Sequence, residues 1–232
     1  MDLGSGALWG AFFAIVVANI LLSGDNAVVI AMAARSLPPH QQRKAIFWGS
    51  AAAIVLRIIL TIAAVQLLQL PYLKLIGGAL LLWIGVQLLV DSDDGGEVQA
   101  HGSMAAAIRT ILVADLVMSL DNVIAVAGAA DRAPEAYRLV LVIVGLAMSI
   151  PLIIAGSTLL MKVMGRFPVI ITLGAALLGF LAGEMFVTDP SDMAWFHEHL
   201  ANAELIVGAV CAVLVVVVGK GLQRRAEARV SA

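Results

Sequence analysis

The chain is short of charge, of cysteine and of basic tracts. Only 13% of its 232 residues are charged and 62% are hydrophobic, whereas soluble domains are about a quarter charged. The net charge of −2, with no basic tract, argues against nucleic acid as a ligand. The single cysteine, Cys211, cannot form an internal disulfide, and its Val/Ala surroundings predict a helix-packing residue. The composition therefore predicts a membrane protein.

Motifs of several enzyme and pump classes are also missing. The sequence has no H-E-x-x-H, no serine–histidine pair within its apolar runs and no nucleotide-binding motif. We therefore expect neither an enzyme nor an ATP-driven pump, and no prosthetic group. The first basic residue is Arg35, so the N-terminus lacks the charged region of a cleavable signal. The first apolar run is accordingly predicted to be a permanent helix.

Seven apolar runs approach or exceed the roughly 20 residues that a helix needs to cross a bilayer. They are Ala7–Ala33, Ala45–Leu68, Tyr72–Val90, Met104–Ala127, Arg138–Met161, Pro168–Met185 and Ala203–Gly219. The predicted fold class is an all-α, polytopic membrane protein, with residues 1–232 forming a single transmembrane domain.

The distribution of lysine and arginine predicts the orientation of these helices. Ten basic residues fall on one side of the predicted bundle: Arg35, Arg43, Lys44, Arg109, Lys162, Arg166, Lys220, Arg224, Arg225 and Arg229. Three fall on the other: Lys74, Arg132 and Arg138. This bias predicts a cytoplasmic C-terminus and, with seven spans, an N-terminus on the outer side of the membrane.

A short motif that contains an aspartate occurs twice and suggests an internal repeat. S-G-D-N at residues 23–26 recurs as S-L-D-N at residues 119–122, an offset of 96 residues. The same offset carries Gly49 onto Gly145 and Gly78 onto Gly174. Each unit, about 7–90 and 103–186, contains three spans, so the second must enter the membrane inverted. The sequence thus predicts an inverted 3+3 repeat with an extra helix at about 203–219.

The repeated motif supplies oxygen ligands. Asp25 and Asp121 are its carboxylates, and the two spans hold neither histidine nor cysteine. Such a set suits hard cations such as Mn²⁺, Ca²⁺ and Mg²⁺. The surrounding candidate ligands are Asn19, Ser23, Asn26, Asp115, Ser119 and Asn122.

Helical geometry sets the aspartates apart from their neighbours. On a straight helix Asn19, Ser23 and Asn26 share one face, and Asp25 points about a third of a turn away. Either each helix opens at its motif, or the two aspartates meet different partners. Gly24 favours local opening in the first copy, whereas the second copy has Leu120 at that place.

Charge counting favours one divalent cation. Three carboxylates, those of Asp25, Asp115 and Asp121, face one mid-span cation, Arg57, which leaves −2 if all are ionised. Protonation of the empty site would couple cation movement to protons. Arg57 is either a gating counter-ion or a static partner, and Glu184 is either a ligand or an interfacial residue. The alternative reading of both motifs is structural glue between helices.

Two further patterns are given structural readings. Gly179 and Gly183 form G-x-x-x-G, which predicts close helix packing. The histidines at 197 and 199 are expected to lie in a solvated loop.

The doubled motif, Asn19-x-x-x-Ser23-Gly24-Asp25-Asn26 and Asp115-x-x-x-Ser119-Leu120-Asp121-Asn122, resembles the TerC family of integral membrane proteins. The resemblance covers essentially the whole chain and is closest to the shorter, YjbE-type members of this family, which belongs to the LysE-like exporter superfamily. It implies a bacterial inner-membrane metal exporter, with Mn²⁺ the favoured ion and Asp25, Asn26, Asp121 and Asn122 carrying it.

Two alternatives stay open beside a Mn²⁺ exporter. One is an exporter of small solutes of the amino-acid type, although a carboxylate-bearing solute would want a positive site. The other is a membrane scaffold that binds metal without transporting it. The sequence leaves open whether the chain forms a homo-oligomer in the lipid bilayer.

Overall fold

The computed structural model describes residues 6–21, 24–67, 72–90, 103–130, 135–191 and 193–230, and within these ranges it is helical, without a strand. The helices are α1 Gly6–Leu21, α2 Gly24–Arg35, α3 Pro39–Leu67, α4 Leu73–Val90, α5 Met104–Ala130, α6 Glu135–Ala147, α7 Ser149–Arg166, α8 Val169–Val187, α9 Met193–His199 and α10 Ala203–Val230. The all-α class predicted from the sequence is confirmed.

Five described helical stretches are long and apolar enough to cross a membrane. They are Pro39–Thr61, Leu73–Val90, Tyr137–Arg166, Val169–Val187 and Ala203–Arg225. These correspond to the predicted second, third, fifth, sixth and seventh spans. The predicted first span coincides with α1 and α2 together, and the predicted fourth span with α5. That these two also cross the membrane stays a prediction.

A proline turn joins α2 to α3. Pro39 occupies the first position of α3, where its missing N–H costs no hydrogen bond. The side-chain amide of Gln42 donates to the carbonyls of Arg35 (3.3 Å) and Leu37 (2.9 Å). It thereby satisfies carbonyl groups that the end of α2 leaves without helical partners. The chain consequently reverses direction within a few residues.

The predicted span Arg138–Met161 is interrupted at Met148, between α6 and α7. Pro151 explains the interruption, because it has no N–H to donate to the carbonyl four residues earlier and its ring crowds that turn. The Ser149 hydroxyl donates to the Leu146 carbonyl at 2.6 Å, which partly compensates for the disturbed ladder.

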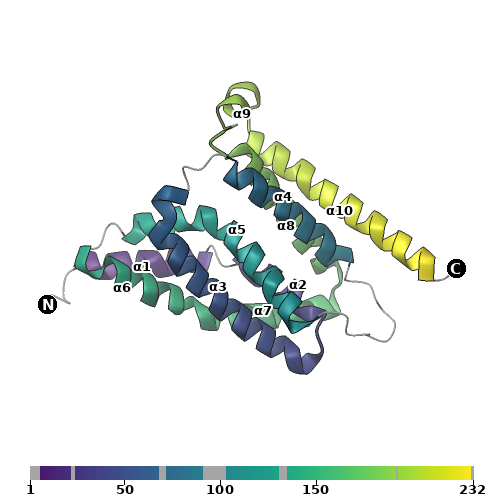
Figure 1. Cartoon of the computed structure of the whole chain (residues 1–232), viewed down its shortest axis with the longest axis horizontal. Helices are drawn as coiled ribbons and strands as arrows, with labels where there is room; N and C mark the ends of the chain where they lie inside the picture. The colour runs from purple at the N-terminus through teal and green to yellow at the C-terminus, as the bar shows by residue number, and fades with distance from the viewer. Residues whose placement is uncertain are drawn as a thin grey trace.

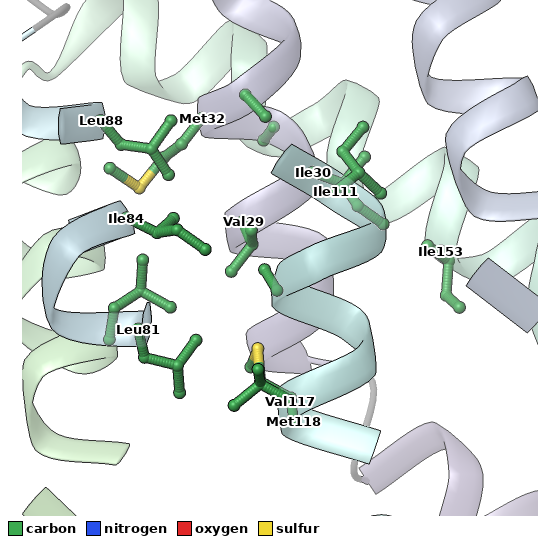
Figure 2. Packing of buried hydrophobic residues seen from close by; sticks show 14 of the residues in the cluster. Val29, Ile30, Met32, Leu81, Ile84, Leu88, Ile111, Val117, Met118 and Ile153 are labelled. Carbon is green, nitrogen blue, oxygen red and sulfur yellow. The ribbon is translucent and has the colours of Figure 1, made fainter. Parts of the chain in front are cut away.

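α4, α8 and α10 pack against one another as one group, and the other long helices form a second group beside it (Figure 1). The hydrophobic core lies between them. Figure 2 shows Val29 of α2 between Ile84 of α4 and the segment of α5 that carries Val117. The predicted close packing at the G-x-x-x-G pair is confirmed: a Cβ on Gly183 would lie 2.6 Å from Cα of Gly208 in α10.

Residue pairs show that α3 and α5 run side by side in the same direction. A Cβ on Gly49 would meet Ile111, and two turns further along Arg57 reaches Ser119. The first and fifth predicted spans are related in the same way. A Cβ on Gly145 of α6 would meet Ile15 of α1, and one on Gly156 of α7 would meet Ala27 of α2.

Candidate functional site

A buried ion pair links the two halves of the chain. Arg57 of α3 is 2% exposed and Asp115 of α5 is 5% exposed, and their side chains meet at 2.5 Å. The Ser119 hydroxyl lies between them: Arg57 Nε donates to it at 3.0 Å, and it donates to Asp115 Oδ2 at 3.1 Å. Each charge therefore has a charged partner and a hydroxyl partner, which a buried ion pair needs in order to offset desolvation.

Asp25 lies close to this network. It is in the first turn of α2 and is half-buried, and Arg57 and Asp115 are both near enough to act electrostatically on its carboxylate. Its Oδ1 accepts a hydrogen bond from the backbone N–H of Asn26 at 2.8 Å. That bond is typical of a helix N-terminus, where backbone N–H groups lack helical acceptors. The structure thus brings together Asp25, Arg57, Asp115 and Ser119, from α2, α3 and α5.

The structure describes the two copies of the motif to different extents. In the first copy α1 is described as far as Leu21 and α2 from Gly24, with residues 22 and 23 outside the description, whereas α5 is described as continuous through the second copy from Met104 to Ala130. On α5 the side chains of Asp115, Ser119 and Asn122 are all buried, as their shared helical face predicts. Asn26, the counterpart of Asn122, is 2% exposed. Whether the first copy opens locally at Gly24, unlike the second with Leu120, stays a prediction.

Several predicted ligands fall outside the description. Ser23 lies between the described parts of α1 and α2, and the side chains of Asn19 and Asp121 are likewise outside it. Their role as ligands stays a prediction. Among the described side chains, no group of three or more His, Cys, Asp and Glu residues is gathered as a metal site.

Glu184 lies in the last turn of α8 and is half-buried. Its neighbour Met185 and Val117 of α5 both approach Gly77 of α4, where a Cβ would lie 2.7 Å and 2.9 Å from them. The end of α8 is therefore beside the part of α5 that carries Asp115 and Ser119. This placement is compatible with either role considered for Glu184.

The pairing of Arg57 with Asp115 was not predicted from the sequence, which left three carboxylates open as partners. The 96-residue offset contains a signal for it. Arg57 falls on Ile153 and Asp115 falls on Asn19, so the charged pair, with one residue from each half, corresponds to a pair of two neutral residues, again one from each half. Such a joint exchange is expected of two side chains that face each other.

A second polar site that sequence reasoning missed lies outside the spans. Asp189 follows α8 and is fully buried, and its carboxylate accepts the backbone N–H groups of Tyr72 and Lys74, each at 3.1 Å, and of Leu75 at 3.4 Å. It therefore caps α4 from more than 100 residues away. The sequence analysis gave no function to this aspartate, because a cap on a distant helix leaves no local pattern.

The pKa of Asp189 follows from the same contacts. Burial alone would raise the pKa of this carboxyl, but the hydroxyl and amide of Ser191 and the amides of Tyr72 and Leu75 donate to it. These bonds outweigh desolvation, which is only partial because exposed Pro190 and Ser191 adjoin the residue. The pKa of Asp189 consequently lies below its ordinary value.

Comparison with known proteins now assigns the family. The model of the integral membrane protein TerC family matches residues 5–227, so the chain belongs to that family. The resemblance inferred from the doubled motif is thereby confirmed.

Several curated relatives are membrane proteins by name. The uncharacterized membrane protein YjbE of Bacillus subtilis is 45% identical over 185 residues, covering 80% of this chain and 83% of YjbE. YceF of B. subtilis, also named an uncharacterized membrane protein, is 27% identical over 53% of this chain and 52% of its own. The inner membrane protein YoaE of Escherichia coli K12 is 26% identical over 72% of this chain and 35% of its own. No solved structure matches the chain significantly.

Proposed function

We propose that this multi-pass membrane protein is a secondary transporter that exports a divalent cation, Mn²⁺ in the first place, from the bacterial cytoplasm. The observation that carries the proposal is the buried pair of Arg57 with Asp115. Arg57 neutralises that carboxylate, so the two motif aspartates, Asp25 and Asp121, account for the remaining charge of −2. One divalent cation neutralises such a site, and a low-dielectric interior penalises any net charge that is left without a counter-ion.

The ligands in this proposal are the motif residues. Asp25 and Asp121 supply charge, and Asn26, Asn122, Ser23, Ser119 and Asn19 supply neutral oxygens. Asp115 is assigned to Arg57 as its counter-ion, because both of its carboxylate oxygens already accept hydrogen bonds. Protonation of Asp25 or Asp121 in the empty carrier would exchange protons for the cation.

The same proposal includes an inverted 3+3 repeat. It is supported by a pair of equivalent contacts. Gly49 packs on Ile111, and Gly145 packs on Ile15, and the 96-residue offset exchanges these two pairs. α3 runs antiparallel to α2 across their short turn and parallel to α5, so α2 and α5 run in opposite directions. Transporters built in this way bind substrate at the interface of the repeats.

The decisive experiment measures ⁵⁴Mn flux in proteoliposomes. The wild-type chain should move Mn²⁺, whereas Asp25→Asn and Asp121→Asn should each lower the rate at least about 100-fold, because asparagine leaves a divalent ion under-neutralised. Glu204→Gln is the matched control, since it removes one exposed carboxylate at the start of α10. Wild-type rates in both aspartate variants would refute the proposed site.

The two alternatives give other results in the same preparation. An amino-acid exporter would move a labelled amino acid and leave ⁵⁴Mn outside. A scaffold would bind Mn²⁺ in equilibrium dialysis and move neither solute. The acidic balance of the proposed site favours a cation over an amino acid as the ligand, and the repeat favours a carrier over a scaffold.

A further inference from the structure

A cavity of about 740 Å³ opens where α2 turns into α3 and where α7 ends. The turn contributes Arg35 and Arg43, and α7 contributes Lys162 and Met164. Among the described residues that line the cavity none is acidic. Three basic side chains thus converge on one hollow.

Helix dipoles account for only part of this charge. Arg35 ends α2 and Lys162 lies near the end of α7, and basic residues are favoured at these negative ends. Arg43 is different, because it is the fifth residue of α3 and lies just past the positive end of that helix. A cation at this place is unfavourable without a nearby anion. Arg43 therefore suggests that the cavity takes an anionic ligand.

The inner wall indicates what kind of anion fits. Met164 is 2% exposed, Met161 is half-buried beside it, and the Thr158 hydroxyl is already committed to the Ile154 carbonyl at 2.7 Å. The mouth is basic and the wall is largely apolar. Dissolved phosphate would interact only with the basic side chains at the mouth. A phospholipid would bind these side chains through its headgroup and pack the first part of its acyl chains against the apolar wall.

We propose that this cavity binds the phosphate of an anionic phospholipid, with Arg43 and Lys162 as its ligands. The site does not involve the aspartates of the proposed transport site, so either proposal stands without the other. A lipid held there would connect the α2–α3 turn with the end of α7, which belong to different halves of the chain.

The test is a lipid titration of the purified full chain in detergent, followed by its thermal unfolding midpoint. Phosphatidylglycerol should raise the midpoint of the wild-type chain, and neither phosphatidylcholine nor inorganic phosphate should do so at equal concentration. A juxtamembrane cation contributes about 1 kcal/mol to binding an anionic surface, which is about five-fold in affinity. Arg43→Gln and Lys162→Gln should therefore each raise the half-saturating lipid concentration about five-fold.

The controls separate this cavity from general surface charge. Lys220→Gln removes an exposed cation on α10, outside the cavity, and should leave the titration unchanged. Arg43→Lys keeps the charge and should keep most of the response. An equal loss in Lys220→Gln and in the cavity variants would overturn the site. An equal response to inorganic phosphate would overturn the lipid as ligand and assign soluble phosphate instead.

Discussion

At the scale of single residues, Arg57 and Asp115 constrain any account of the site. Each would be costly alone among apolar helices, and together they form a neutral unit closed by Ser119. The 96-residue offset relates these two positions to Ile153 and Asn19, again one residue from each half of the chain. The chain therefore contains two solutions to the same packing position, one ionic and one neutral.

This comparison predicts the outcome of a double substitution. Arg57→Ile alone leaves Asp115 buried without its cation and should cost about 3–5 kcal/mol of stability. Arg57→Ile with Asp115→Asn reproduces the neutral pair at the matching positions and should recover most of that loss. Thermal unfolding in detergent, followed by size-exclusion fluorescence, measures both variants. A double variant no more stable than the single one would contradict the prediction.

The same variants separate stability from transport. Asp25 and Asp121 keep their charge of −2 in the double variant, whereas Arg57→Ile alone leaves −3 around the site. ⁵⁴Mn flux in proteoliposomes should therefore persist in the double variant, within about ten-fold of the wild-type rate. Loss of flux from a stable double variant would show that Arg57 acts in transport as a gating counter-ion.

Sequence reasoning reached the acidic residues and missed their partners for a physical reason. The motif repeats at a fixed offset, so Asp25 and Asp121 stand out in the printed sequence. Which carboxylate Arg57 pairs with depends on the register of α3 against α5, and a long-range packing register leaves no local signal.

At the scale of elements, the start of α4 depends on Asp189. Three backbone N–H groups of that helix start share one carboxylate. Asp189→Asn removes the charge and turns an amide toward donors, so we expect a loss of about 2 kcal/mol, typical of hydrogen bonds to a charged group. The thermal midpoint at pH 7 measures the loss, and Glu204→Gln is the control that should lower the midpoint less, because this exposed carboxylate only complements the first turn of α10.

The depressed pKa of Asp189 gives this stabilisation a pH dependence. The carboxylate is favoured in the folded state, so its contribution is complete above the unfolded pKa of about 3.9 and is lost as pH falls through the lower folded value. The difference between wild type and Asp189→Asn should therefore shrink below about pH 4. A difference that stayed constant down to pH 2 would exclude the carboxylate as its source.

Because α8 packs closely on α10, substitution of Gly183 and of Gly221 by alanine should affect stability differently. Alanine favours a helix over glycine by about 1 kcal/mol at either place. A Cβ on Gly221 would meet nothing within 4 Å, but one on Gly183 would lie 2.6 Å from backbone atoms of Gly208 and Val207. Gly221→Ala should therefore be neutral or stabilising, and Gly183→Ala should lower the thermal midpoint because backbone cannot yield as a side chain does. Equal midpoints would contradict the contact.

Hydropathy predicted the helices better than their internal breaks. The five apolar stretches follow from length and composition alone. The interruption at Met148 could have been expected from Pro151, but a proline in a membrane helix is often accommodated without a break. The local opening that Gly24 favours in the first copy of the motif stays a prediction.

At the scale of the whole molecule, the turns and helix ends that carry polar residues lie in two groups, one at each end of the helix bundle. The turn at Pro39 lies beside the end of α7, as their shared cavity requires, and Leu37 packs with Ala107 near the start of α5. The start of α4 lies beside the end of α8 through Asp189. These contacts place the α2–α3 turn and the end of α7 at one end of the bundle, and Figure 1 shows the start of α4 near the other end, beside α9.

This division predicts the topology, which cysteine labelling can read directly. Cys211→Ala gives a cysteine-free background, since the chain has one cysteine. Single cysteines at Arg43, Lys162 and Lys220 should react with a membrane-impermeant maleimide only after permeabilisation, because the excess of basic residues predicts a cytoplasmic location. Cysteines at Tyr72 and Asn202, both exposed, should react in intact cells.

If all five cysteines showed the opposite accessibility, the predicted orientation would be wrong and the inverted repeat would stand. Labelling of Arg43 and Lys162 from opposite sides would contradict the shared cavity and the repeat, because both require these two loops on one face.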